Sequence, residues 1–279
     1  AQYLDDMVLA GLAHAVVLRS PHAHAIVEKI DASSARAATG VLAVLTAEDA
    51  KSDGLHSLRP TSEINVKTGA PLAFMPQPLL AAGKVRYVGE PVAIVIAETR
   101  EQALDAAEQI VVDYTPLPVV TTTAAARAAD APRIADEVPG NVCLDWQTGD
   151  TVGVEAALAG AAHVVTLSLD NHRIAINPME PRGIVAVHDP ATGRYTAHVS
   201  SQNVHGIRDF CARALGVSPA TVRFVAPDVG GNFGAKNFIY PEYVLMLWAA
   251  RRLGRPVKRM ATRSEVLLAD HQARDQQAT

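Results

Sequence analysis

Three glycines within five residues are the feature that most constrains this chain. The stretch Gly230-Gly231-Asn232-Phe233-Gly234 follows a strand-like run, residues 221–225, and precedes the most apolar helical run, residues 241–253. Glycine loses the most conformational entropy on folding and adds no side chain to a core, so it is useful where φ must be positive or backbone must approach another group. The stretch is predicted to be a strand-to-helix loop that lies against a ligand. Free N–H groups at such a turn would suit an anion.

The loop alone does not identify that ligand. Its spacing is not Gly-x-Gly-x-x-Gly, and Lys236 is followed by Asn237 rather than by Ser or Thr. Neither a dinucleotide site nor a Walker loop is therefore supported. A tight turn that lets two backbone segments pass each other remains an alternative.

Composition narrows the class of protein. Of the 279 residues 49% are hydrophobic and 19% are charged, which is typical of a globular chain. The net charge of −4 and the scattered basic residues argue against nucleic-acid binding. No apolar run has the roughly 18 to 20 residues that a membrane span needs. The two cysteines, Cys143 and Cys211, are too few for a disulfide scaffold. We expect a cytoplasmic protein, and the abrupt ends of the chain lead us to expect a fragment of a longer one.

Elements along the chain divide into two domains and a linker. Strands that flank short helices indicate a small α+β domain over residues 1–118. Residues 119–149 are rich in Pro, Ala and Thr and are predicted to be a linker. A second domain covers residues 150–279, with a strand expected over residues 162–169 and a hairpin around residues 189–193.

Further along, the second domain alternates strand and helix, and this pattern alone suggests a doubly wound sheet. If its strands are parallel, Gln202-Asn203 and the glycine loop meet at one edge of the sheet, where ligands of such sheets bind. Gln202 could offer an N–H to an oxo or carbonyl oxygen there. The alternative is a residue at a helix start that faces water.

Other candidates are weaker. His22 and His24 would lie on one face of an extended segment, but two ligands do not make a metal site, so no metal ligands are assigned. Glu180 is expected to pair with Arg182 or a neighbour rather than to act in catalysis. No Ser/His/Asp or Cys/His arrangement supports hydrolase chemistry.

Five short motifs, taken together and in order, resemble one family. They are Arg19-Ser20-Pro21-His22-Ala23-His24-Ala25, Tyr87-Val88-Gly89-Glu90-Pro91-Val92-Ala93, Met179-Glu180-Pro181-Arg182, Ser201-Gln202-Asn203 and Gly230-Gly231-Asn232-Phe233-Gly234-Ala235-Lys236. The chain resembles, over essentially its whole length, the molybdopterin-binding large subunit of the xanthine dehydrogenase, aldehyde oxidase and aerobic carbon monoxide dehydrogenase family.

The resemblance implies an α+β fold, with an N-terminal α/β-hammerhead domain followed by an incomplete first molybdenum-cofactor-binding domain. It implies a molybdopterin-dependent oxidoreductase that hydroxylates a carbon centre with water as the oxygen source. The cofactor would be molybdopterin with molybdenum, in the cytosine dinucleotide form. The partners would be the remainder of the large subunit, a [2Fe-2S] small subunit and an FAD-binding medium subunit, with a small-molecule substrate.

By match to the family motifs, Gln202 corresponds to the glutamine that hydrogen-bonds the apical molybdenum oxo group, and Phe233 corresponds to a residue packed at the metal. The cofactor-binding residues would be Gln202, Gly231, Asn232, Phe233, Gly234 and Ala235. Asn237 would face the substrate; purine-hydroxylating members have an acidic residue there, so an aldehyde or an N-heterocycle is expected instead. Asn232 also departs from the third glycine of many members.

The family's catalytic Glu and most of its cofactor contacts have no counterpart among these 279 residues. The chain alone is therefore expected to be inactive. The leading hypothesis is the N-terminal part of a molybdenum hydroxylase large subunit. The alternative is a non-catalytic structural or assembly module that keeps the fold without the active site.

Overall fold

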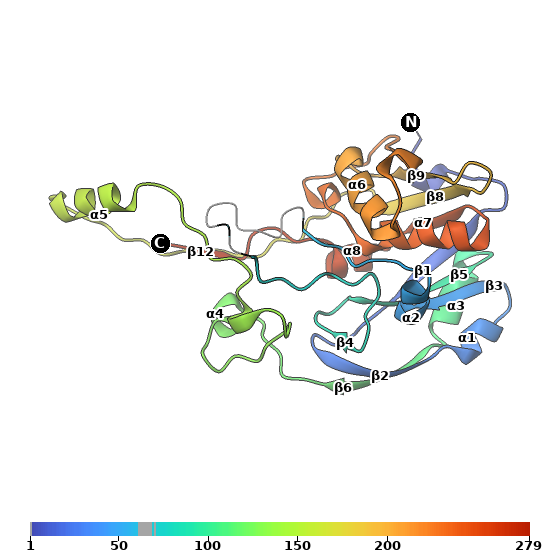
Figure 1. The fold of residues 1–279 in the computed structure, drawn as a ribbon, viewed down its shortest axis with the longest axis horizontal. Helices are drawn as coiled ribbons and strands as arrows, with labels where there is room; N and C mark the ends of the chain where they lie inside the picture. The colour runs from blue at the N-terminus through green and yellow to red at the C-terminus, as the bar shows by residue number, and fades with distance from the viewer. Residues whose placement is uncertain (1, 61–68, 70) are drawn as a thin grey trace. The chain divides into compact units, whose positions relative to one another are not determined.

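The structure is a computed structural model that describes residues 2–60, 69 and 71–279 (Figure 1). Its chain forms two compact units. The first comprises Ala1–Pro60, Pro76–Val119 and Ile176–His271, and the second comprises Thr61–Met75, Val120–Ala175 and Gln272–Thr279. Each unit is described by itself.

A seven-stranded mixed sheet is the frame of the first unit. Its order is β10-β9-β8-β11-β1-β5-β3, with bounds β10 Val222–Val225, β9 Arg194–Val199, β8 Gly183–Asp189, β11 Val257–Met260, β1 Ala13–Arg19, β5 Pro91–Ala97 and β3 Val41–Thr46. The pairs β10/β9 and β1/β11 are parallel, whereas β8 is antiparallel to both β9 and β11. A doubly wound parallel sheet, which the pattern alone suggested, is therefore wrong, because the β8–β9 hairpin inserts an antiparallel strand.

Strand β5 shows why both faces of the sheet are covered. All seven of its residues are buried. Successive side chains of a strand point to opposite faces, and Ile94 and Ile96 join a core cluster with α6 (Val204–Leu215) and α7 (Pro241–Leu253). Ala93, Val95 and Ala97 instead join a cluster with α3 (Arg100–Ala107) and α1 (Ser33–Ala37). The helix α7 is the centre of the larger cluster, since its first ten residues are all buried.

The remaining elements of the first unit are small. A three-stranded antiparallel sheet has the order β4-β2-β6, with β4 Lys84–Val85, β2 Ala25–Asp31 and β6 Val111–Pro116. Two short helices, α2 (Ala47–Ser52) and α8 (Arg263–Ala269), begin at capping boxes on Thr46 and Thr262. Gly216 and Gly254 end α6 and α7 in the left-handed conformation, with φ of 68° and 63°.

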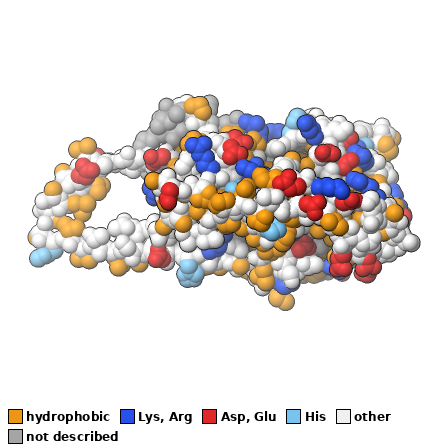
Figure 2. Space-filling view, turned by 90° about the horizontal axis from the view of Figure 1, so that it is seen from below, with side chains coloured by type: hydrophobic (Ala, Val, Ile, Leu, Met, Phe, Trp, Pro, Cys, Tyr) orange, Lys and Arg blue, Asp and Glu red, His pale blue; other side chains and the backbone are white. Residues whose placement is uncertain are grey.

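The second unit has little regular structure. It contains α4 (Thr123–Ala126), α5 (Thr151–Gly160) and a two-stranded sheet of β7 (Leu169–Asn171) and β12 (Gln276–Ala278). The strand predicted over residues 162–169 is wrong for residues 162–168. In the described part of the chain no strand pairs with them, and a strand needs a hydrogen-bonding partner. Apolar side chains of this segment stay exposed, among them Val165 at 91%. Figure 2 shows hydrophobic side chains, coloured orange, on the surface of the protein.

No helix among the described residues combines the length and the apolar character needed to cross a lipid bilayer.

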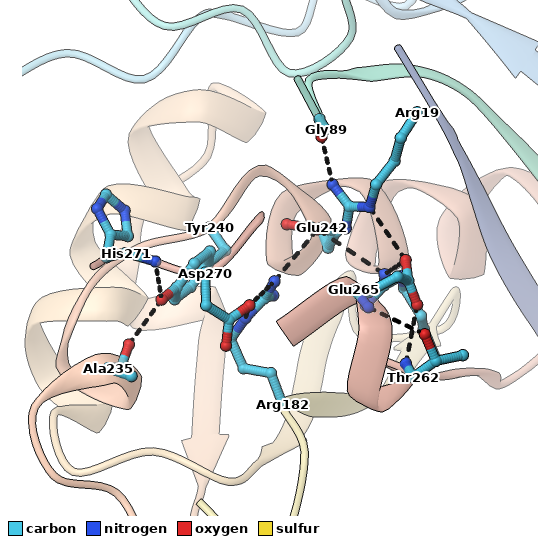
Figure 3. A network of polar contacts seen from close by, with 11 residues as sticks. Arg19, Gly89, Arg182, Ala235, Tyr240, Glu242, Thr262, Glu265, Asp270 and His271 are labelled. Carbon is cyan, nitrogen blue, oxygen red and sulfur yellow. Dashed lines mark hydrogen bonds and ion pairs between the residues drawn. The ribbon is translucent and has the colours of Figure 1, made fainter. Parts of the chain in front are cut away.

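Charged side chains from distant segments meet in the interior of the first unit (Figure 3). Glu242, on the first turn of α7, forms an ion pair with Arg19 at the end of β1. Its Oε1 lies 3.5 Å from Nη2 of Arg182 and 3.9 Å from Nη2 of Arg259. Glu265 on α8 contacts Arg19 at 3.0 Å and Arg259 at 2.6 Å. Glu242 is almost fully buried, and burial opposes its ionisation. The guanidinium groups of Arg182, Arg19 and Arg259 outweigh this and hold the pKa of Glu242 well below its usual range.

We expect Glu242→Gln to lower the free energy of unfolding at pH 7 by about 3 kcal/mol, because it leaves buried guanidinium groups without their carboxylate. A carboxyl group with a depressed pKa in the folded state adds stability above its unfolded pKa, about 4.3 for Glu, and loses it as the pH falls further. The difference between variant and wild type should therefore shrink below about pH 4. Urea unfolding of the complete protein at pH 7 and below about pH 4 measures this difference in the free energy of unfolding.

Glu98→Gln is the matched control, since Glu98 is an exposed partner of Arg255. It should leave the midpoint nearly unchanged. A Glu242→Gln midpoint equal to that of wild type at pH 7 would contradict the expectation.

Candidate functional site

Two strand-to-helix loops converge at one edge of the seven-stranded sheet. Because β9 and β10 are parallel, their carboxyl ends lie at the same edge. The Ser201 hydroxyl donates to the Lys236 carbonyl at 2.8 Å, and the Gln202 N–H donates to the same oxygen at 3.4 Å. The predicted convergence of Gln202-Asn203 with the glycine loop is confirmed.

The backbone of the glycine loop is unusual at three of its residues. Gly231 and Gly234 have φ of 97° and 96°, and Phe233 between them has φ of 50°. Positive φ is rare for an aromatic residue and marks local strain, which is often found at functional sites. The Phe233 side chain is 75% exposed, so burial does not account for this conformation.

Gly230 has a different reason to be glycine. A Cβ at this position would lie 2.6 Å from the Cβ of Glu180. The two residues approach closely and form two hydrogen bonds, both of 2.9 Å. The Glu180 N–H donates to the Gly230 carbonyl, and the Gly230 N–H donates to the Glu180 side-chain oxygen Oε2. Both sequence interpretations of the loop, positive φ and close approach, therefore hold at different residues.

A buried ion pair lies beneath the loop. Lys236 Nζ donates to Glu180 Oε2 at 3.1 Å, and the two side chains are 1% and 9% exposed. Burial lowers the pKa of Lys236, while the bond to Glu180 acts in the opposite direction. Of the partners expected for Glu180, Arg182 or a neighbour, Arg182 is not the one, because its guanidinium binds Asp270 at 2.7 Å and lies near Glu242. The structural pair of Glu180 is with Lys236.

Open donors remain on the loop. Within the described residues, no acceptor is found for the backbone N–H groups of Gly231, Asn232, Phe233 and Gly234. The Gln202 side chain is exposed and has no protein partner in the same part of the chain. No heavy atom lies within 4 Å of a Cβ built on Gly234. Neutral donors around open space fit an oxygen-rich, anionic cofactor such as molybdopterin.

The other predicted site residues lie on the same loop with different surroundings. Asn232 uses its side chain internally, since its Oδ1 accepts the Lys236 N–H at 3.2 Å. Ala235 is buried, and its carbonyl accepts from the Tyr240 hydroxyl at 2.7 Å. Asn237 is exposed at the end of the loop. All of them stay predictions as cofactor or substrate contacts.

Several residues that shape the loop were not predicted. Tyr240 and His271 bracket its carboxyl end, because the Tyr240 hydroxyl donates to Ala235 and accepts the His271 N–H at 3.0 Å. The ion pair of Lys236 with Glu180 was also not predicted. The signal in the sequence was a lysine among small and apolar residues, which needs an acidic partner when it is buried.

The histidines of the first motif lie elsewhere in the fold. The ring of His22 lies against Tyr114, and His24 Nδ1 is 2.7 Å from the Pro118 carbonyl oxygen. A search of the described residues finds no group of three or more His, Cys, Asp or Glu arranged to hold a metal ion.

Comparisons with known proteins match the whole chain. The family model of the aldehyde oxidase and xanthine dehydrogenase a/b hammerhead domain matches residues 1–118, and that of the molybdopterin cofactor-binding domain matches residues 134–279. The chain is 37% identical to the carbon monoxide dehydrogenase large chain of Hydrogenophaga pseudoflava, over 98% of this chain and 34% of that protein. It is 35% identical to the nicotine 6-hydroxylase large subunit of Paenarthrobacter nicotinovorans, over 100% of this chain and 33% of that protein.

Solved structures agree with these matches. Quinoline 2-oxidoreductase from Pseudomonas putida 86 superposes with a TM-score of 0.87 at 34% identity, covering 99% of this chain and 34% of that one. The Cu,Mo-CO dehydrogenase gives a TM-score of 0.88 at 35% identity, covering 98% and 35%. The chain thus spans about a third of the length of the relatives it matches.

We expect Gly230→Ala to lower the free energy of unfolding by about 1 to 3 kcal/mol, because the added methyl group overlaps Glu180. Gly160→Ala is the control, since nothing lies within 4 Å of a Cβ at that helical position. Urea unfolding of both variants measures the effect. Equal midpoints for the two would show that the close approach of Gly230 to Glu180 is unimportant.

Proposed function

The chain belongs to the xanthine dehydrogenase, aldehyde oxidase and carbon monoxide dehydrogenase family, and on this premise we propose that it is part of the large subunit of a molybdenum hydroxylase. Family membership and the α+β class, with a hammerhead domain followed by a molybdenum-cofactor-binding domain, agree with the sequence predictions. The limits of a linker over residues 119–149 remain a prediction.

The observation that carries the proposal is the convergence of Gln202 with a loop of unpaired N–H groups. When bound, a molybdopterin cofactor supplies the two-electron oxidation of a carbon centre with water as the source of oxygen. The chain's own residues bind and orient it. The Gln202 carboxamide would donate an N–H to an oxygen of the cofactor, and the backbone N–H groups of Gly231 to Gly234 would do the same from the facing loop.

Phe233 and Ala235 have different parts in this proposal. Phe233 exposes its ring, one edge of which lies against Gly231, and would exclude water from the cofactor there. Ala235 is buried and anchors the loop through its carbonyl. The cytosine dinucleotide form of the cofactor is proposed from the family resemblance.

For the substrate we propose an aldehyde or an N-heterocycle. Two relatives are named for nicotine and quinoline, both N-heterocycles, and a third is named for carbon monoxide. Asn237, exposed at the end of the loop, is a neutral donor and acceptor where an acidic residue would favour a purine. The relatives' names as a large chain and a large subunit support the presence of partner subunits. That these are a small [2Fe-2S] subunit and a medium FAD-binding subunit is proposed from the family resemblance.

In the complete enzyme, we expect Gln202→Ala to lower kcat by about 100-fold with molybdenum retained, because one hydrogen-bond donor to the cofactor is lost. Steady-state kinetics on N-heterocycles and aldehydes, with metal analysis of the same sample, measure it. His205→Ala, an exposed change on the first turn of the next helix, is the control. Full turnover by Gln202→Ala would refute the assigned contact.

The isolated 279-residue chain should hold less than stoichiometric molybdenum. Its site offers neutral donors only, because the charge of Lys236 is already balanced by Glu180. Elemental analysis of the chain produced alone and together with a full-length relative's partner subunits tests this. One molybdenum per chain, with a full pterin, would overturn the expectation.

A further inference from the structure

We propose that Glu180, through its ion pair with Lys236, is the positioning residue that fixes the glycine loop and Gln202 relative to each other. The proposal rests on the proposed function, because it assigns the pair a purpose at the same site. Neither side chain is proposed to touch the cofactor or the substrate.

One carboxylate oxygen binds both ends of the loop. Glu180 Oε2 accepts from the N–H of Gly230 at 2.9 Å and from Nζ of Lys236 at 3.1 Å. These donors lie six residues apart and enclose the segment with the unpaired N–H groups. A backbone bond from the Glu180 N–H to the Gly230 carbonyl, also 2.9 Å, fixes the carboxylate against the loop.

Lys236 carries this constraint to the neighbouring loop. Its carbonyl accepts from the Ser201 hydroxyl and from the Gln202 N–H, while its own N–H donates to the Asn232 side chain. A shift of the Lys236 backbone therefore moves Gln202 and the glycine loop together. Among the described residues, the Glu180 side chain accepts hydrogen bonds from Gly230 and Lys236, and of these two only Lys236 also contacts the loop that carries Gln202.

Burial makes the pair a stiff connection. With side chains 1% and 9% exposed, the pair is screened little by water or salt, and a charge-assisted bond in such surroundings is stronger than a neutral one. The other carboxylate oxygen, Oε1, is buried without a hydrogen-bond partner in the described part of the chain. An unsatisfied buried oxygen costs stability, so selection for stability alone would not favour an ionised group here.

The test uses the complete enzyme and three variants. Glu180→Gln keeps the shape and an acceptor but removes the charge, and Lys236→Met removes the ammonium group and keeps the length. Lys258→Met is the matched control, because Lys258 is also a buried lysine, bonded to the carbonyl and carboxylate of Asp5, and makes no contact with either loop. Amide hydrogen exchange of residues 226–240, molybdenum content, kcat, KM and the Mo(V) electron paramagnetic resonance spectrum are measured for each.

We expect Glu180→Gln and Lys236→Met to speed exchange in residues 226–240 at least 10-fold and to lower kcat by about 10-fold to 100-fold, as misplacement of a site by an ångström can do. KM should change less than about threefold, and the Mo(V) spectrum should shift, because the displaced groups surround the cofactor. Lys258→Met should alter none of these, even where it lowers the melting temperature.

Unchanged exchange in both variants, or faster exchange with wild-type kcat and spectrum, would overturn the proposal. A matching loss of kcat in Lys258→Met would do so as well, because the effect would then be general destabilisation. Failure of the proposed function would give a different result: the wild-type enzyme would lack molybdenum, or Gln202→Ala would retain full turnover. The exchange rates of residues 226–240 would still show whether the Glu180–Lys236 ion pair fixes the loop.

Discussion

The ionised carboxylate of Glu242 in the core is the constraint on which the first unit depends. A lone carboxylate cannot stay charged in such surroundings, so arginines must come to it from wherever they lie in the sequence. They come from β1, from the residue just before β8 and from β11, and these three strands belong to one sheet. The acid thereby requires the segment before residue 20 and the segments after residue 180 to fold together.

This network is better understood as specifying an arrangement than as supplying stability. Replacing a buried charge network with well-packed apolar residues is often neutral or stabilising, whereas removing one member is costly. The driving force for folding comes instead from the apolar cluster of β5, α6 and α7, which would tolerate several packings. We hypothesise that the charges discriminate among those packings, because a packing that leaves one member unpaired would contain an uncompensated buried charge. Those members are Arg19, Arg182, Arg259, Glu242, Glu265 and Asp270.

Local signals in the sequence were sufficient for the elements and for the position of the site. The alternation of strand with helix predicts that Gln202 and the glycine loop meet at one edge if the strands are parallel, and β9 and β10 are parallel. No local sequence pattern predicts which distant residues form ion pairs with each other. The sequence predicts a structural pair of Glu180 with Arg182 or a neighbour, but in the fold Arg182 pairs with Asp270 and Glu180 pairs with Lys236, 56 residues away. The strand predicted over residues 162–169 is wrong for residues 162–168 for a similar reason, because a strand forms only with a hydrogen-bonding partner.

The two charge systems meet at the glycine loop. The Arg182 guanidinium carbon lies 3.6 Å from the centroid of the Tyr240 ring, and the Tyr240 hydroxyl donates to the Ala235 carbonyl (Figure 3). Glu180 accepts hydrogen bonds from Gly230 and Lys236. These supports flank residues 231–234, whose backbone N–H groups have no acceptor among the described residues. A positive φ at Phe233 costs on the order of 1 to 3 kcal/mol and persists only where the surrounding structure over-determines it. Rigid flanks and an unpaired, strained centre are what a site needs when its donors must point at a ligand before the ligand arrives.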